Sequence, residues 1–152
     1  MLTMNEKDKN EMLEAILNEN EAYQCKLWAV IMAGADTYAL IGGLSTLTGG
    51  TAAALGALSN AYCYLGVTEQ HLNMVIVNSV NVSKIENRLS LPLSSITKAE
   101  VKGGILPGRK VVMLHFGKEK MKISLMNNAI GSDIQGQKEN VEMFCQIVSK
   151  LG

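Results

Sequence analysis

The sequence predicts a single α+β domain, mainly β, in which about seven antiparallel strands form a barrel closed by a C-terminal helix. Three observations lead to this fold class. Segments rich in Val, Ile, Leu and Tyr recur after residue 61, as the strands of an antiparallel sheet do. Turn signals containing Gly or Pro separate these segments. An apolar stripe at helical spacing then ends the chain.

The stretch from Tyr62 to Lys102 carries the clearest strand pattern. Two apolar segments, Tyr62–Val67 and His71–Asn78, flank the polar turn at residues 68–70 and predict a hairpin. The next segment alternates in polarity, which is typical of a half-buried antiparallel strand. We expect one of its faces to hold Ile85, Asn87, Leu89 and Leu91, and the other to hold Lys84, Glu86, Arg88 and Ser90.

A corner follows this alternating strand. Pro92 ends the pairing because proline has no backbone N–H to donate to a ladder. Ser94 and Ser95 then turn the chain into a further strand from Ile96 to Lys102. Strands that change direction at such a corner suit orthogonally packed sheets or a small barrel.

The order of these features resembles the bacterial pleckstrin-homology-like family, which includes PH-like and GRAM-like domains. The matching parts are the hairpin Tyr64–Leu72, the corner Pro92–Ile96, the strand that ends at Val101 and a closing helix. The resemblance extends from Tyr62 to the C-terminus, and it implies a PH-like barrel with a first strand at Gln24–Met32. A fold shared by lipid binders, peptide binders and scaffolds does not name an activity.

Two more strands and a helix are predicted in the C-terminal third. Lys110–Phe116 and Lys120–Met126 form a hairpin around a Gly-containing turn, with Met121, Ile123 and Leu125 facing inward. An i, i+3, i+4, i+7 stripe follows at Val141, Phe144, Cys145 and Val148. We expect this terminal helix to bury its stripe over the open end of the barrel.

The chain divides into three parts within one domain of residues 1–152. Residues 1–21 contain an amphipathic helix over Lys9–Asn20, with apolar Met12, Leu13, Ile16 and Leu17. This helix either caps one end of the barrel or binds a partner. Residues 34–61 form a Gly/Ala-rich insert, and residues 62–152 form most of the barrel and the capping helix.

The insert belongs to an unusual region, because no residue from 37 to 68 is charged. Asp36 and Thr51 predict the starts of two short helices separated by paired glycines. Small residues recur at every fourth position and form a candidate interaction surface of Ser45, Gly49, Ala53 and Ala57. Three interpretations stay open: a helical insert against the barrel or a neighbouring subunit, an interfacial membrane contact, and a Gly/Ala linker.

Charge and cysteine content restrict the class of partner and the compartment. The 14 basic and 14 acidic residues leave no net charge, whereas nucleic-acid binding needs a clustered positive excess. The three cysteines are widely spaced, and the N-terminus lacks the apolar core of a secretion signal. We therefore expect free thiols and a cytoplasmic protein, with peripheral membrane association left open.

Few residues suggest a catalytic or metal-binding role. His71 and His115 lie in strands without ligands at metal spacing, and no nucleophile elbow or phosphate loop is present. We therefore expect no catalysis, no cofactor, no metal and no small-molecule substrate. A candidate basic rim comprises Arg109, Lys110, Lys118, Lys120 and Lys122.

Two functions follow from these features. The first is a binding or scaffolding module that acts through protein contacts, including contacts with itself as a homo-oligomer. The alternative is a peripheral membrane module that uses the uncharged residues 37–68 together with the basic rim, since basic residues attract anionic headgroups. The same lysines are also typical of a solvated edge strand that resists aggregation.

Overall fold

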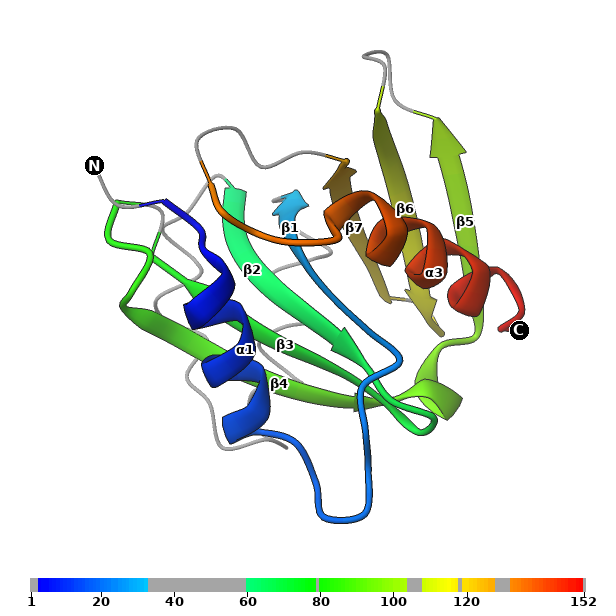
Figure 1. Cartoon of the computed structure of the whole chain (residues 1–152). Coiled ribbons are helices and arrows are strands. Elements are labelled where there is room, and N and C mark those ends of the chain that lie inside the picture. Colours follow the sequence, from blue (N-terminus) through cyan, green and yellow to red (C-terminus); the bar gives the residue numbers. More distant parts are fainter. Residues whose placement is uncertain are drawn as a thin grey trace.

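The computed structural model describes residues 3–32, 60–78, 80–103, 108–117, 119–127 and 132–151 of the 152 residues. Figure 1 shows its elements. In chain order they are α1 (Glu6–Ala15), β1 (Cys25–Met32), β2 (Asn60–Val67), β3 (His71–Val77), β4 (Ile85–Pro92), the short 3₁₀ helix η1 (Leu93–Ser95), β5 (Lys98–Gly103), β6 (Arg109–Phe116), β7 (Glu119–Met126) and α3 (Gln137–Ser149). The candidate residues that lie outside the described ranges are Ser45, Gly49, Ala53, Ala57 and Lys118.

All seven strands belong to one antiparallel sheet, in the order β4-β3-β2-β1-β7-β6-β5. This confirms the mainly β architecture with an N-terminal and a C-terminal helix. The strands β4 and β5 are the edges of the sheet, and no ladder joins them within the described ranges. The sheet is therefore open, and barrel closure stays a prediction.

The main core lies between α3 and one face of the sheet, which we call the inner face. Every second residue of β1 is buried, as the pleat of a half-buried strand requires. The side chains of Val141, Phe144 and Val148 in α3 are buried in this core. The inward-facing residues of β7 join the same cluster: Met121, Ile123 and Leu125. The predicted helical stripe and the predicted inner side of β7 are both confirmed.

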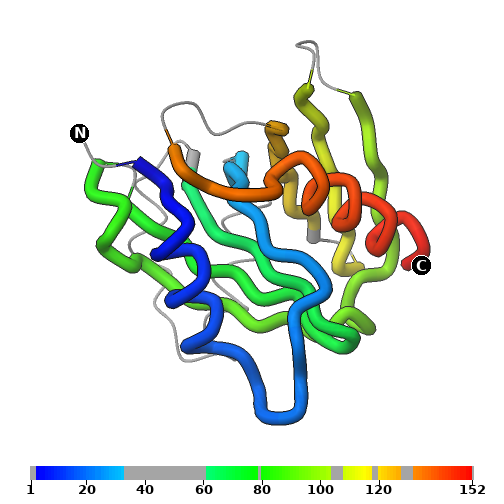
Figure 2. The backbone as a smooth tube through the Cα atoms, viewed as in Figure 1, coloured from blue at the N-terminus to red at the C-terminus, as the bar shows by residue number. Residues whose placement is uncertain are grey.

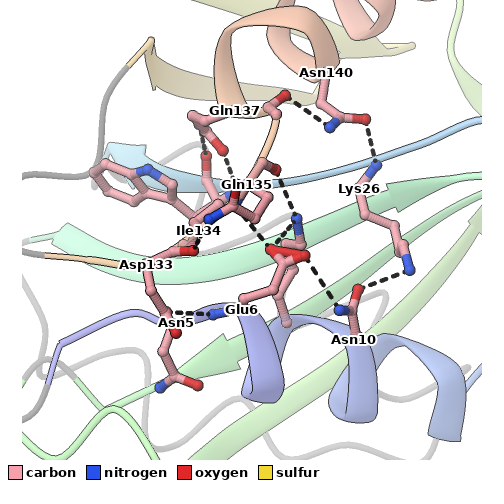
Figure 3. A network of polar contacts seen from close by, with 12 residues as sticks. Asn5, Glu6, Asn10, Lys26, Asp133, Ile134, Gln135, Gln137 and Asn140 are labelled. Carbon is pink, nitrogen blue, oxygen red and sulfur yellow. Dashed lines mark hydrogen bonds and ion pairs between the residues drawn. The ribbon is translucent and has the colours of Figure 1, made fainter.

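The start of α3 also provides hydrogen-bond partners for the backbone of β1. Strand β1 pairs with β7 only over Val30–Met32, so its first five residues have backbone groups without a β7 partner. Gln137 fills this gap: its Oε1 accepts from the Trp28 N–H at 3.2 Å, and its Nε2 donates to the Trp28 carbonyl at 3.0 Å. Asn140 accepts from the Lys26 N–H at 3.1 Å. Figure 3 shows these contacts, which anchor α3 where β1 and β7 separate.

Helix α1 begins earlier and ends earlier than the predicted Lys9–Asn20. The side chain of Asn5 accepts from the Asp8 N–H at 2.8 Å, so Asn5 is the N-cap. The helix packs on the outer face of the sheet, where Leu13 meets Tyr64 and Val75. It does not cap an open end of the sheet, because its apolar residues contact β1, β2 and β3 from outside.

Polar contacts fasten α1 to the chain that precedes α3. The N–H of Glu6 donates to Asp133 at 3.0 Å, and the Glu6 carboxylate accepts from the Gln135 N–H at 3.0 Å. The buried Lys9 ammonium lies 2.7 Å from the same carboxylate. On the next turn, Asn10 accepts from the Lys26 ammonium at 2.7 Å. These contacts, drawn in Figure 3, connect α1 with β1 and with the start of α3.

One predicted strand face is wrong at its first residue. Asn87, Leu89 and Leu91 are buried, as expected. Ile85 instead packs in the outer cluster beneath α1. The register between β3 and β4 shifts between Ile76 and Val77, so that Val77 pairs with Ile85 and Ile76 with Asn87. A bulge of this kind reverses the face of the residues beyond it.

Candidate functional site: the outer face of strands β5 to β7

The structure divides the predicted basic rim between two faces of the sheet. Arg109, Lys120 and Lys122 lie on the outer face, since Lys120 pairs with His115 and Lys122 pairs with Met113. Lys110 pairs with Leu125, a buried core residue, and therefore lies on the side of α3. The rim predicted from the sequence is thus not one surface.

Strand β5 adds charges that the sequence analysis did not include. Lys98, Glu100 and Lys102 lie opposite His115, Met113 and Val111 and therefore share the outer face. Their alternation along β5 is the sequence signal that would have revealed them. We call the combined surface the basic face, and it comprises Lys98, Glu100, Lys102, Arg109, Val111, Met113, His115, Lys120 and Lys122.

Glu100 is the single carboxylate of the basic face. His115 Nε2 lies 3.3 Å from Glu100 Oε2, and Lys98 Nζ lies 3.2 Å from Glu100 Oε1. The hydrogen bonds from His115 and then Lys98 lower the pKa of this carboxyl group. Lys102, Lys120 and Lys122 are exposed and form no ion pair with any residue of the described ranges. The surface therefore carries a positive excess.

Arg109 lies across the basic face instead of extending into solvent. Its Nε donates to Ser124 Oγ at 2.9 Å, and its Nη2 lies 3.9 Å from the Met32 sulfur. The guanidinium group is therefore held over β7, toward β1. Val111 and Met113 are half-buried between these cations. The basic face thus has an apolar centre and a charged periphery.

A second polar cluster lies at the turn between β2 and β3. His71 Nδ1 is 2.8 Å from Glu21 Oε1, and Thr68 Oγ1 donates to the same oxygen at 2.6 Å. The hydrogen bond from His71 and then that from Thr68 lower the pKa of Glu21 from 4.5 to about 2. This cluster ties the segment before β1 to the hairpin, so His71 has a bracing role.

The cysteines do not form a reactive site. Cys25, Cys63 and Cys145 are free and buried, which confirms the prediction of three unpaired thiols. Burial raises the pKa of Cys25 to about 12 and raises the pKa of Cys63 and Cys145 as well. A thiol is a poor nucleophile when its thiolate is disfavoured. Among the described residues, no three His, Cys, Asp or Glu side chains lie close enough to hold a metal ion.

The architecture defined above is an open antiparallel sheet of seven strands whose core is covered by a C-terminal helix. No protein-family model and no curated protein sequence matches this chain. Its fold is similar to that of the hSac2 domain from human phosphoinositide phosphatase Sac2, with a TM-score of 0.52 and 11% sequence identity. The similarity covers 91% of this chain and 74% of that chain, and at this identity it shows the fold alone. No helix within the described ranges is long and apolar enough to span a membrane.

Proposed function

We propose that this chain is a non-catalytic binding module that acts through protein contacts. The basic face carries the proposal. Its exposed cations Lys102, Lys120 and Lys122 surround the half-buried Val111 and Met113, and an apolar centre within a polar rim is the usual anatomy of a protein interface. Helix α1 contacts β1, β2 and β3, and α3 packs on the inner face. Neither described helix covers the basic face, so we assign this face to an external partner.

The same proposal assigns the module to the pleckstrin-homology-like class. The seven antiparallel strands and the terminal helix over the core support this assignment, and so do the hairpin and the proline corner noted in the sequence. We also propose that the sheet closes into a barrel and that the protein is cytoplasmic.

A non-catalytic role agrees with the positions of the perturbed titratable groups. Glu21 is engaged by His71 and Thr68 at a turn, and the three thiols lie in the core. Active sites combine shifted pKa values with an accessible cleft. Glu21 does line a hollow of about 300 Å³, but its carboxylate is occupied by His71 and Thr68, which connects two structural elements. We therefore assign these groups to folding.

Peripheral membrane binding is the second candidate, and the location of the lysines on a single face favours it. Lysine and arginine residues near an anionic membrane contribute about 1 kcal/mol each. Lys98, Lys102, Arg109, Lys120 and Lys122 share one surface, so all five could approach the same bilayer. The chain also leaves the sheet at Met32, opposite Lys122, before it enters the uncharged residues 37–68.

The proposed function is tested with a fluorescein-labelled polyglutamate peptide, which presents an acidic polypeptide to the basic face. The anisotropy of the peptide should rise with protein concentration at low salt. Lys120→Glu with Lys122→Glu should weaken binding by about tenfold or more, because about 1.4 kcal/mol of lost attraction gives that factor. Lys138→Glu in α3 with Lys150→Glu at its C-cap, two exposed changes, alter the net charge equally and should have a small effect.

Vesicles separate the two candidates. Co-sedimentation with phosphatidylserine vesicles but no anisotropy change with the peptide would replace the protein-binding proposal by the membrane candidate. Equal loss of peptide binding in both double variants would show that net charge, and not the basic face, is responsible. Absence of binding to peptide and vesicles alike would reject the basic face as an interaction surface.

A further inference from the structure

The charges of this neutral chain are segregated along the sequence. Residues 1–21 contain six acidic and two basic residues, whereas residues 98–122 contain seven basic and two acidic residues. Figures 1 and 2 show α1 and strands β5 to β7 on opposite sides of the molecule. No ion pair joins the two regions within the described ranges.

The negative region exposes carboxylates on α1, on the loop that follows it and at the β2–β3 turn. Its exposed carboxylates, which we call the acidic surface, are Glu11, Glu14, Glu19 and Glu69. None of the four forms an ion pair within the described ranges. Two lysines lie nearby: Lys7 is exposed four residues before Glu11 on α1, and the Lys26 ammonium donates to the neutral Asn10 side chain. The four carboxylates outnumber these two cations, so the region keeps a negative excess.

The two carboxylates of α1 do not serve the helix itself. Glu14 lies in the last turn, where the helix dipole favours a cation, and this turn contains no basic residue. Glu11 lies three positions earlier, so the two negative charges also repel each other. Both side chains line a hollow of about 490 Å³ next to Ala15 and Lys26. A lysine from outside would relieve this repulsion and could enter the hollow.

We propose that the basic face of one copy docks on the acidic surface of a second copy, head to tail. This inference rests on the proposed function and names the partner of the same surface. Both halves of the contact are present on one chain: exposed lysines around an apolar centre, and exposed carboxylates around a hollow. In a head-to-tail contact, the basic face of one copy meets the acidic surface of the next. Each copy of such a pair therefore keeps one of its two patches free. A head-to-tail contact extends into a chain or closes into a ring, whereas reciprocal pairing of both patches between two copies would give a two-fold dimer.

Sedimentation velocity of the full chain tests the contact. At about 10 mM salt, where the Debye length is about 30 Å, the weight-average sedimentation coefficient should rise with protein concentration. At about 1 M salt, where it is about 3 Å, the coefficient should fall to the monomer value. A monomer at every concentration in low salt would overturn the proposal.

Two double variants then identify the patches. Lys120→Glu with Lys122→Glu should stay monomeric at low salt, and so should Glu11→Lys with Glu14→Lys. Mixed in equal amounts, the two variants should associate again. In this mixture the first variant contributes an intact acidic surface and the second contributes an intact basic face. A mixture that stays monomeric, or either variant associating like the unaltered chain, would contradict head-to-tail docking.

Matched controls distinguish this contact from a general charge effect. Lys138→Glu with Lys150→Glu and Glu139→Lys with Glu142→Lys change exposed residues of α3 and its C-cap by a net charge of the same size. Both double variants should associate like the unaltered chain. Circular dichroism checks that every variant is folded.

The two proposals fail in different ways. A monomeric protein that still binds polyglutamate keeps the binding function and loses the self-association. A monomeric protein that binds only phosphatidylserine vesicles loses both and supports the membrane candidate.

Discussion

Gly66 of β2 lies beneath the ring of Tyr23, and this contact helps to align α1 with the sheet. A Cβ atom at Gly66 would lie 2.4 Å from Tyr23 Cε1. The ring has little freedom to move aside, because its hydroxyl donates to the Leu13 carbonyl at 2.5 Å and accepts from Asn73 Nδ2 at 3.0 Å. The glycine thus allows Tyr23 to connect the end of α1 with β3.

Gly66→Ala should therefore destabilise the protein. Overpacking of this kind costs about 1–3 kcal/mol, and the displaced ring would also lose its hydrogen bonds. Urea unfolding followed by circular dichroism measures the change. Gly103→Ala is the control, since no atom lies within 4 Å of a Cβ at that position. Equal effects of the two substitutions would show that Tyr23 adapts without loss.

Glu21 should make the folded state sensitive to acid. Its pKa is lowered from 4.5 to about 2 by His71 and Thr68, so its contribution to stability is fully present above pH 4.5 and is lost as the pH falls toward 2. Glu21→Gln should lower the melting temperature at neutral pH. The difference from the unaltered chain should shrink between about pH 4.5 and pH 2. A difference that stays constant over this range would show that the Glu21 carboxylate is not preferentially stabilised by folding.

At the scale of elements, α3 joins the two parts of the sheet. Its apolar side chains fill the core, and Gln137 bonds the backbone of both Trp28 and Met126. Strands β1 and β7 separate at this point because their ladder covers only Val30–Met32. The helix therefore replaces the missing part of the ladder and does not merely cover the core.

Phe144→Ala should lower the melting temperature by on the order of 10 °C. Truncation of a buried Phe costs about 3–5 kcal/mol, and each 1 kcal/mol shifts the melting temperature of a domain this size by about 2–4 °C. The adjacent Met143 is 41% exposed, so Met143→Ala is a matched control with a small expected effect. A thermal melt in which both variants resemble the unaltered chain would mean that α3 adds little to the stability of the core.

At the scale of the whole molecule, one core unites elements that are distant in sequence. Cys25 in β1, Cys63 in β2 and Cys145 in α3 belong to the same cluster of buried residues. A single cooperative core opens as a unit. The three thiols should therefore become accessible together.

Alkylation with iodoacetamide over a denaturant series, read by mass spectrometry, checks this expectation. Without denaturant the native chain should remain unmodified, because burial disfavours the thiolates. In the transition region, unmodified and triply modified chains should predominate. Modification of Cys145 alone at lower denaturant would show that α3 detaches before the sheet unfolds.

The sequence by itself determined most elements and many of their faces. The alternation in β7 and the helical stripe in α3 are local periodicities, and each specifies a buried side without reference to a partner. The separation of Lys110 from Arg109 could also have been predicted, since adjacent residues in a strand point to opposite faces.

Tertiary structure decided which faces meet. Strand order brings Lys98 and Lys102 beside the lysines of β7 through two ladders, and pairing between separate segments is invisible to a local pattern. The shift in register near Val77 moves Ile85 to the outer cluster, because a bulge changes the side that alternation would assign. The separation of acidic and basic surfaces likewise could be seen only in the fold. Composition shows only that the net charge is zero, whereas the positions of the residues in three dimensions decide whether opposite charges can meet.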